Sequence, residues 1–180
     1  MNDPTIVRPA GMADLDRLEE LLLALQDHIE QANPELWRMK PEGREALRAQ
    51  VANRLGTAAG TALVAEHPED GVVGVIFARV VANHRYEPHL AGLVDQAYVR
   101  ADHRRRGLAS RLVAEVCRFF AEQGVSDVSL RYVVGNDEAA AFWQAVGFVP
   151  RIITAGATLE AIQARLLPDQ DPRVSGGPSS

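Results

Sequence analysis

Apolar residues recur along this chain at two kinds of spacing, and each kind predicts one type of element. Spacings of three and four residues place apolar side chains on one face of a helix. They predict helices at residues 13–31 and 42–55, from residue 108 to a stop at Gly124, and from residue 136 to Gly147. Alternating or short apolar runs rich in Val and Ile predict strands. They predict six strands, at residues 5–8, 62–66, 72–81, 93–99, 125–134 and 148–154.

The order of these elements predicts an α/β fold built on a mixed sheet. The second and third strands are joined by a short turn, as in a hairpin, whereas the fourth and fifth are joined through a helix. In residues 155–167 the apolar spacing suits a helix, but a strand also fits. We assign residues 1–167 to a single domain and expect the polar residues 168–180 to form a disordered tail.

Composition limits the class of protein. The 180 residues are 47% hydrophobic and carry a net charge of −5, as expected of one globular domain with an ordinary core. An acidic chain is a poor binder of nucleic acid, and no apolar run approaches the ~20 residues of a membrane span. Because the N-terminus does not resemble a signal peptide, we expect a cytoplasmic protein that binds neither nucleic acid nor membrane. The histidines and Cys117 are not at metal-ligand spacings, so no metal site is expected, and Cys117 falls on the apolar face of the third helix.

The third helix begins in a way that local rules disfavour. Arg104, Arg105 and Arg106 lie at its N-terminal end, whose partial positive charge favours acidic residues, so each arginine costs about 0.3–1 kcal/mol. Gly107 costs about 1 kcal/mol relative to alanine in the first turn. The fourth helix instead opens with Asn136 and two acids, as the same rules favour. Violations gathered at one place indicate a site, and free amides, arginines and a glycine together predict a receptor for a polyanion such as pyrophosphate.

The arginine run has a simpler interpretation, a solvated basic surface or a patch that faces nucleic acid or a protein. Charge runs are more often solvated than functional. Three features favour the anion site here: the position at a strand-to-helix turn, the continuation into Gly107-x-Ala109, and the acidic charge of the whole chain.

Two sequence motifs then identify a family. The pattern Arg-x-x-Gly-x-Ala at residues 104–109, after Ala-Tyr-Val at residues 97–99, resembles the pyrophosphate-binding motif of the GNAT superfamily of N-acetyltransferases. The pattern Asn-x-x-Ala-x-x-Phe-Trp at residues 136–143, followed by Gly-Phe at residues 147–148, is similar to the second motif through which this superfamily contacts coenzyme A. The opening Ile-Val-Arg-Pro-Ala at residues 6–10 also resembles that of many members.

The resemblance covers residues 5–154 and implies both the fold and the cofactor. It implies a GNAT-like α/β domain whose mixed, mostly antiparallel sheet splays apart between the fourth and fifth strands and is flanked by helices. Acetyl-CoA would enter this cleft as co-substrate, with its pantetheine along the fourth strand and its pyrophosphate on the amides of residues 105–110. The residues expected to bind it are Tyr98, Val99, Arg104, Arg105, Arg106, Gly107, Leu108, Ala109, Ser110, Asn136, Phe142 and Trp143.

Two of these residues have structural alternatives. Asn136 either bonds the pantetheine or caps its own helix. Trp143 either forms a wall against the cofactor or packs in the core beside Phe142 and Phe148. Many members carry a tyrosine at this position, where the hydroxyl can protonate the departing thiolate. Because the indole N–H of tryptophan cannot act as that acid, no residue is assigned as the general acid.

The resemblance also implies direct attack of an amine on the thioester. An alkylammonium with a pKa near 10.4 is neutral in only about one molecule in 2,500 at pH 7, so a group or a water must take its proton. Asp95 is the candidate base because it is the only acid in the fourth strand, where alternation places it on one face with Leu93, Ala97 and Val99. It is equally well explained as a structural acid at the strand edge. Glu87, in the loop before that strand, is a second candidate.

These inferences predict an acetyl-CoA-dependent N-acetyltransferase whose acceptor is an amine. The acceptor pocket is expected between the first two helices, the loop at residues 83–90 and the end of the chain. The alternative is a non-catalytic module of the same fold that binds acyl-CoA, and a third hypothesis is a protein-interaction or nucleic-acid module in which the arginines face a partner. The segment after residue 154 is a candidate contact in a homodimer.

Overall fold

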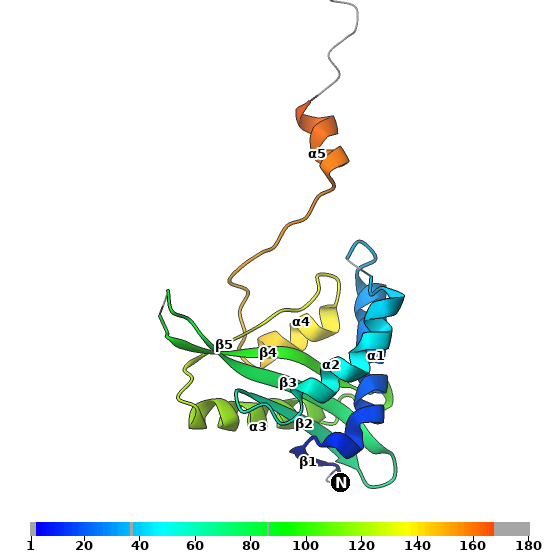
Figure 1. Ribbon diagram of the computed structural model, residues 1–180, viewed down its shortest axis with the longest axis vertical. Coiled ribbons are helices and arrows are strands. Elements are labelled where there is room, and N and C mark those ends of the chain that lie inside the picture. The colour runs from blue at the N-terminus through cyan, green and yellow to red at the C-terminus, as the bar shows by residue number, and fades with distance from the viewer. Residues whose placement is uncertain (1–2, 37, 86, 168–180) are drawn as a thin grey trace, which may run out of the picture. The chain divides into compact units, whose positions relative to one another are not determined.

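The computed structural model describes residues 3–36, 38–85 and 87–167, so the tail expected at residues 168–180 lies outside the described part. The chain divides into two units, Met1–Phe148 and Val149–Ser180, and the first contains the sheet (Figure 1). The described strands are β1 (Ile6–Pro9), β2 (Gly60–His67), β3 (Gly71–Ala82), β4 (Leu90–Val99) and β5 (Asp127–Leu130). They lie side by side in chain order; β4 and β5 are parallel and the other pairs antiparallel. The mixed, mostly antiparallel sheet is therefore confirmed.

Helices cover both faces of this sheet (Figure 1). They are α1 (Leu15–Ala32), α2 (Pro41–Arg54), α3 (Leu108–Glu122) and α4 (Asp137–Ala145). Successive residues of β3 divide between two cores, because strand side chains alternate: Phe77 packs with α1 and α2, and Ile76 packs with α3. Both faces of β3 are thus buried, which explains its continuous run of apolar residues. No helix in the described residues is both long and apolar enough to cross a membrane.

Residues 148–167 contradict the predicted sixth strand and resolve the ambiguous segment after it. The ambiguous segment contains a helix, α5 (Leu159–Leu166), whose N-terminus is capped by the Thr158 hydroxyl. The sixth strand predicted at residues 148–154 is wrong, because these residues form no strand. A strand needs a neighbour to receive its backbone hydrogen bonds. This segment pairs with none in the described part of the chain, and Pro150 has no N–H to donate.

The buried face of α3 is narrower than its sequence predicts. Leu108, Leu112, Val116 and Phe120, each four residues apart, form the buried stripe. Cys117 is exposed, so its expected place in the core is wrong; one residue beyond Val116 turns a side chain about 100° around the helix. At the end of the stripe, the Phe120 ring lies against Gly92 of β4 so closely that a Cβ there would be 2.7 Å from it.

A β-bulge in β4 shapes the open side of the sheet. Phe77 of β3 pairs with Gln96, but the next residue, Ala78, pairs with Val94, which leaves Asp95 as an extra residue in β4. The parallel pairing between β4 and β5 also ends at Val94. Beyond the bulge β4 continues without β5 beside it, as the resemblance implied for the fourth and fifth strands.

We expect Gly92→Ala to lower the free energy of unfolding by about 1–3 kcal/mol, because the added methyl group would overlap the buried Phe120 ring. Denaturant titration would show this as a lower midpoint. Gly11→Ala is the matched control, since Gly11 has φ −128° and no heavy atom within 4 Å of an added Cβ. Equal midpoints for the two variants would contradict the close contact between β4 and α3.

Candidate functional site

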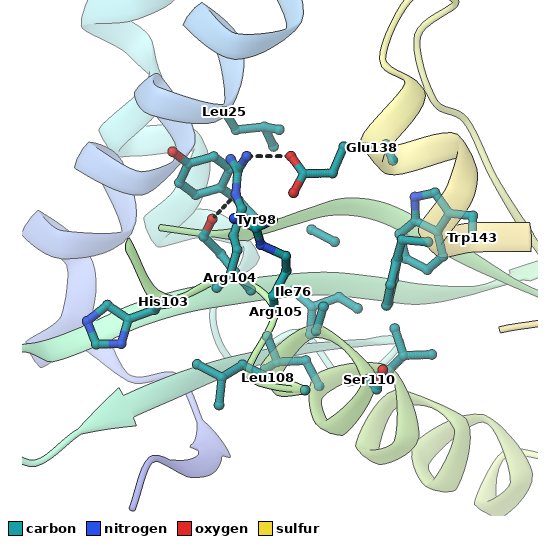
Figure 2. A pocket seen from close by; sticks show the side chains of 18 of the residues that line it. Leu25, Ile76, Tyr98, His103, Arg104, Arg105, Leu108, Ser110, Glu138 and Trp143 are labelled. Atoms are coloured by element: carbon teal, nitrogen blue, oxygen red, sulfur yellow. Dashed lines mark hydrogen bonds and ion pairs between the residues drawn. The ribbon is translucent and has the colours of Figure 1, made fainter. Parts of the chain in front are cut away.

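A cavity of about 380 Å³ lies beside the part of β4 that β5 does not cover (Figure 2). Every residue predicted to bind the cofactor lines it except Arg106. The Arg106 guanidinium instead donates a hydrogen bond of 3.0 Å to the backbone carbonyl of Asp102. Sequence analysis did not identify the other lining residues, which are Leu25, His28, Ile76, Ala97, His103, Leu112, Val113, Glu138 and Ala139.

One wall of the cavity is the loop that leads into α3. It follows a short 3-10 turn, η2 (Ala101–His103), and contains two residues with left-handed backbone, Arg105 at φ +59° and Gly107 at φ +77°. A left-handed φ is uncommon for a residue with a side chain. No side chain caps the first turn of α3, and no heavy atom lies within 4 Å of a Cβ added at Gly107. The start of α3 therefore offers uncapped N–H groups beside a cavity, the arrangement in which helix N-termini bind anions.

Arg104 bridges the two sides of the cavity (Figure 2). Its guanidinium donates to the Val99 carbonyl at 3.0 Å and to the Glu138 carboxylate at 2.6 Å. It also lies 5.5 Å from the centre of the Tyr98 ring, within range of a cation–π contact. This side chain therefore links the end of β4 to the first turn of α4.

Asn136 and Trp143, the two motif residues with structural alternatives, each have a structural contact and also line the cavity. The Asn136 side chain caps α4, because its Oδ1 accepts a hydrogen bond of 3.1 Å from the Ala139 N–H. Trp143 is only 7% exposed and packs edge-on against Phe142 and Phe148, with ring centres 4.9 and 5.4 Å away. Asn136 and Trp143 also line the cavity. A structural role and a place in the cavity wall therefore coexist at both positions.

Asp95 lies on a different face of β4 from the one that the sequence predicted. Its carboxylate accepts hydrogen bonds from Arg54 of α2 at 2.7 Å and from Arg79 of β3 at 3.1 Å, and Arg54 also donates to Gln96. Two successive residues thus point toward α2, whereas Ala97 packs with α3. The predicted face is wrong because a bulge breaks strict alternation. Burial lowers the pKa of the Arg54 guanidinium, and the nearby Asp95 carboxylate opposes this shift.

Neither candidate base lines the cavity. Asp95 is absent from its wall, and both of its oxygens are held by arginines. Glu87 is exposed in the loop between β3 and β4, where its carboxylate accepts a hydrogen bond of 3.1 Å from the His89 N–H. Their assignment as bases stays a prediction that rests on the sequence alone.

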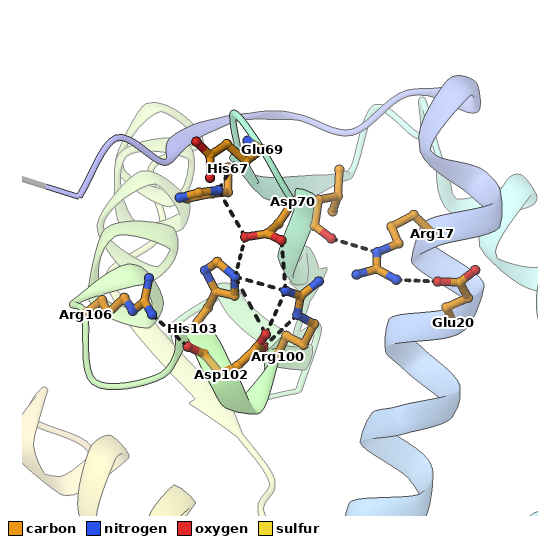
Figure 3. A network of polar contacts seen from close by, with 10 residues as sticks. Arg17, Glu20, His67, Glu69, Asp70, Arg100, Asp102, His103 and Arg106 are labelled. Atoms are coloured by element: carbon orange, nitrogen blue, oxygen red, sulfur yellow. Dashed lines mark hydrogen bonds and ion pairs between the residues drawn. The ribbon is translucent and has the colours of Figure 1, made fainter.

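A polar network holds η2 in place beneath the loop (Figure 3). His103 is 3% exposed, and its Nε2 lies 3.1 Å from both the Asp70 carboxylate and the Arg100 guanidinium. His67 reaches the same Asp70 oxygen at 3.3 Å. Arg100 also forms two hydrogen bonds of 2.7 Å with Asp102 and lowers the pKa of that carboxyl to about 2. The network fixes the loop to the turn between β2 and β3, so Arg104 and the residues after it start from a defined point.

A second cavity, of about 310 Å³, adjoins the first. His28, Asn136 and Glu138 line both, so the two cavities share a wall. The remaining lining residues of the second are Gln31, Ala32, Gly135 and Asp137. Sequence analysis placed the first helix at the acceptor pocket without naming these residues. The signal available was the spacing of three and four residues that puts Leu25, His28 and Ala32 on one helix face.

Several known proteins resemble this chain in sequence or in fold. The sequence model of the Acetyltransferase (GNAT) family matches residues 22–148. No curated protein matches the chain. The tetramutant of the BH1408 protein from Bacillus halodurans has a similar structure, with a TM-score of 0.76 at 14% identity over 86% of this chain and 99% of that one.

Two further structures with this fold are acetyltransferases. The aminoglycoside acetyltransferase meta-AAC0020 from an uncultured soil metagenomic sample, in complex with trehalose, gives a TM-score of 0.64 at 16% identity, covering 88% of this chain and 98% of that one. The aminoglycoside antibiotic 6'-N-acetyltransferase AAC(6')-Ih from Acinetobacter baumannii gives 0.67 at 16% identity, covering 86% and 99%. At such low identity these structures are evidence for the fold alone. The family match spans more than half of the sequence, and the chain therefore belongs to the GNAT acetyltransferase family.

Proposed function

We propose that this protein transfers an acetyl group from acetyl-CoA to an amine, with both substrates bound at once. One observation carries the proposal: a single cavity joins an open strand edge to an uncapped helix start. Beyond Val94, β5 no longer pairs with β4, so that edge suits an extended ligand with amide groups such as pantetheine. The uncapped amides of α3 suit a pyrophosphate.

The charges of the loop support the same assignment. Arg104 and Arg106 are engaged by neighbouring protein groups. Arg105, by contrast, has no hydrogen bond or ion pair within the described residues, and it lines the cavity. A guanidinium without a protein partner can pair with a phosphate through two parallel hydrogen bonds. Arg105 and the start of α3 would together hold the most highly charged part of the cofactor.

The chemistry places modest demands on the protein. The acceptor nitrogen attacks the thioester carbonyl carbon, the C–S bond breaks, and coenzyme A leaves as a thiolate. A thiol with a pKa near 8.5 is a fair leaving group, so Trp143 need not supply a proton. The aromatic side chains of Phe142 and Trp143 contribute an apolar wall, which helps to keep water from the thioester.

A non-catalytic acyl-CoA-binding module is the second candidate function. The observation that favours it is that Arg54 and Arg79 hold both oxygens of the Asp95 carboxylate, which does not line the cavity. The two functions share the cofactor site and differ only in turnover, so they are separated by measuring turnover directly.

Calorimetric titration tests the cofactor site. We expect acetyl-CoA to bind the wild-type chain with a micromolar dissociation constant and Gly107→Glu to weaken binding by at least tenfold, because a carboxylate at the start of α3 would repel the pyrophosphate. Gly124→Glu is the matched control at the opposite end of α3. Gly124 also has left-handed backbone, φ +71°, and no heavy atom lies within 4 Å of a Cβ added there. A glutamate at either position would therefore be under the same backbone strain. Equal loss in both variants, or no binding by the wild type, would overturn the proposed cofactor site.

Release of the coenzyme A thiol tests turnover. We expect release with at least one amine from a panel of an amino sugar, a polyamine, an amino acid, a small alkylamine and a lysine-containing peptide, together with a mass increase of one acetyl group on that amine. Initial rates at varied concentrations of both substrates should give intersecting lines, as expected of a ternary complex. Tight acetyl-CoA binding without release for any amine would favour the non-catalytic module.

A further inference from the structure

One face of α1 runs along both cavities. Leu25 and His28 line the first cavity, and His28, Gln31 and Ala32 line the second. These residues are three or four apart, so they form one stripe on the helix. His28 is the residue of this stripe that belongs to both cavities. His28 therefore lies at the junction between the proposed cofactor site and the second cavity.

The C-terminal end of α1 is held against the start of α4. The Asn33 side chain donates a hydrogen bond of 3.2 Å to the Val134 carbonyl. Gly135, with φ +95°, approaches so closely that a Cβ there would lie 2.5 Å from the Ala32 carbonyl oxygen. Only glycine fits such an approach without a shift of the backbone. His28, one turn before this contact, is thereby fixed beside the residues that begin α4.

Of the two histidines that line the first cavity, His28 is the one whose ring has no partner within the described residues. It forms no hydrogen bond or ion pair within the described residues, although it is partly buried. His103, the other histidine in the wall of the first cavity, has its Nε2 3.1 Å from both Asp70 and Arg100, whereas its buried Nδ1 has no hydrogen-bond partner in the described part of the chain. Glu138 is bonded to Arg104. Both ring nitrogens of His28 therefore lack a partner among the described residues, and His28 is the histidine that also lines the second cavity.

We propose that the second cavity receives the acceptor amine and that His28 is the general base that takes its proton. The inference rests on the proposed function. In this reaction the bound ammonium gives one proton to the neutral imidazole, and the resulting amine forms a bond to the thioester carbon. As the C–S bond breaks, the second proton of the nitrogen passes through water to the departing thiolate. The imidazolium then releases its proton to solvent, which restores the base.

The charges around His28 suit a cationic acceptor. From α4, Asp137 and Glu138 line the second cavity, whereas that cavity has no lysine or arginine among its described lining residues. Arg104 neutralises Glu138, so Asp137 carries the uncompensated charge. The remaining ionisable groups that line the first cavity with His28 are Tyr98, His103 and Arg105. An ammonium would therefore be attracted to the second cavity and the phosphates to the first.

The test compares pH–rate profiles with the panel amine that turns over fastest. If His28 is the base, kcat/KM for the ammonium form rises through the range where imidazoles titrate, about pH 5–8, and then reaches a plateau. His28→Gln keeps a polar side chain of similar size but cannot take a proton. We expect it to lower kcat by about 10²–10⁴-fold at pH 7 and to replace the plateau with a rise that continues toward pH 10, because only the free amine then reacts. Affinity for acetyl-CoA should change by less than threefold.

Two further variants separate catalysis from structure. His84→Gln makes the same change at an exposed histidine. Its loop was expected at the acceptor pocket from the sequence, but no described residue of this loop lines either cavity, so the variant should leave the profile unchanged. His28→Ala should regain activity when imidazole is added, which a purely structural role would not allow. A wild-type plateau retained in His28→Gln would overturn the assignment of the base while leaving acetyl transfer intact. Binding of acetyl-CoA without turnover for any amine would overturn both the base and the proposed function.

Discussion

The site depends on the point where β4 loses β5 as its partner, next to the single residue inserted at the bulge of β4. A sheet normally satisfies the backbone groups of an inner strand on both sides. Here the parallel pairing with β5 ends at Val94, and the extra residue, Asp95, follows at once. The second half of β4 therefore keeps one edge free of strand partners, and the cavity lies along it. The bulge needs its own support, which Arg54 of α2 and Arg79 of β3 provide by holding the Asp95 carboxylate.

The loop before α3 shows how an electrostatically unfavourable helix start is maintained. Positive side chains at a helix N-terminus are disfavoured, but two of the three arginines are neutralised or occupied by groups from elsewhere in the chain. The loop itself is fixed through His103 and Arg100, which bind Asp70 of a different turn. Tertiary contacts thus offset the cost of the arrangement, whereas the Arg105 guanidinium has no hydrogen bond or ion pair within the described residues. Such a balance is expected where binding and folding place opposite demands on the same residues.

The parts of the site that could be predicted from sequence are those that depend on the residue preferences of a single helix start. Arg104, Arg105 and Gly107 violate the rules for a helix start, and all three line the first cavity. The bulge could not be predicted in this way. The sequence of β4 shows only which residues alternate, whereas the inserted residue is defined by how β4 pairs with β3. His28 was not predicted for a similar reason. Its proposed role depends on where the end of α1 meets α4, a contact between segments about one hundred residues apart.

Under the proposed function, the two cavities explain how an acidic chain would hold an anionic cofactor. With a net charge of −5, the protein as a whole repels phosphate groups and attracts ammonium groups. Salt screens charges beyond about 8 Å at physiological ionic strength, so the groups that touch a ligand outweigh the distant ones. Arg105 and the uncapped amides of α3 therefore set the local sign in the first cavity, and Asp137 sets the opposite sign in the second. Glu138 lines both cavities and is paired with Arg104 of the first, so under the proposed function this shared wall adds no net charge between the two substrates.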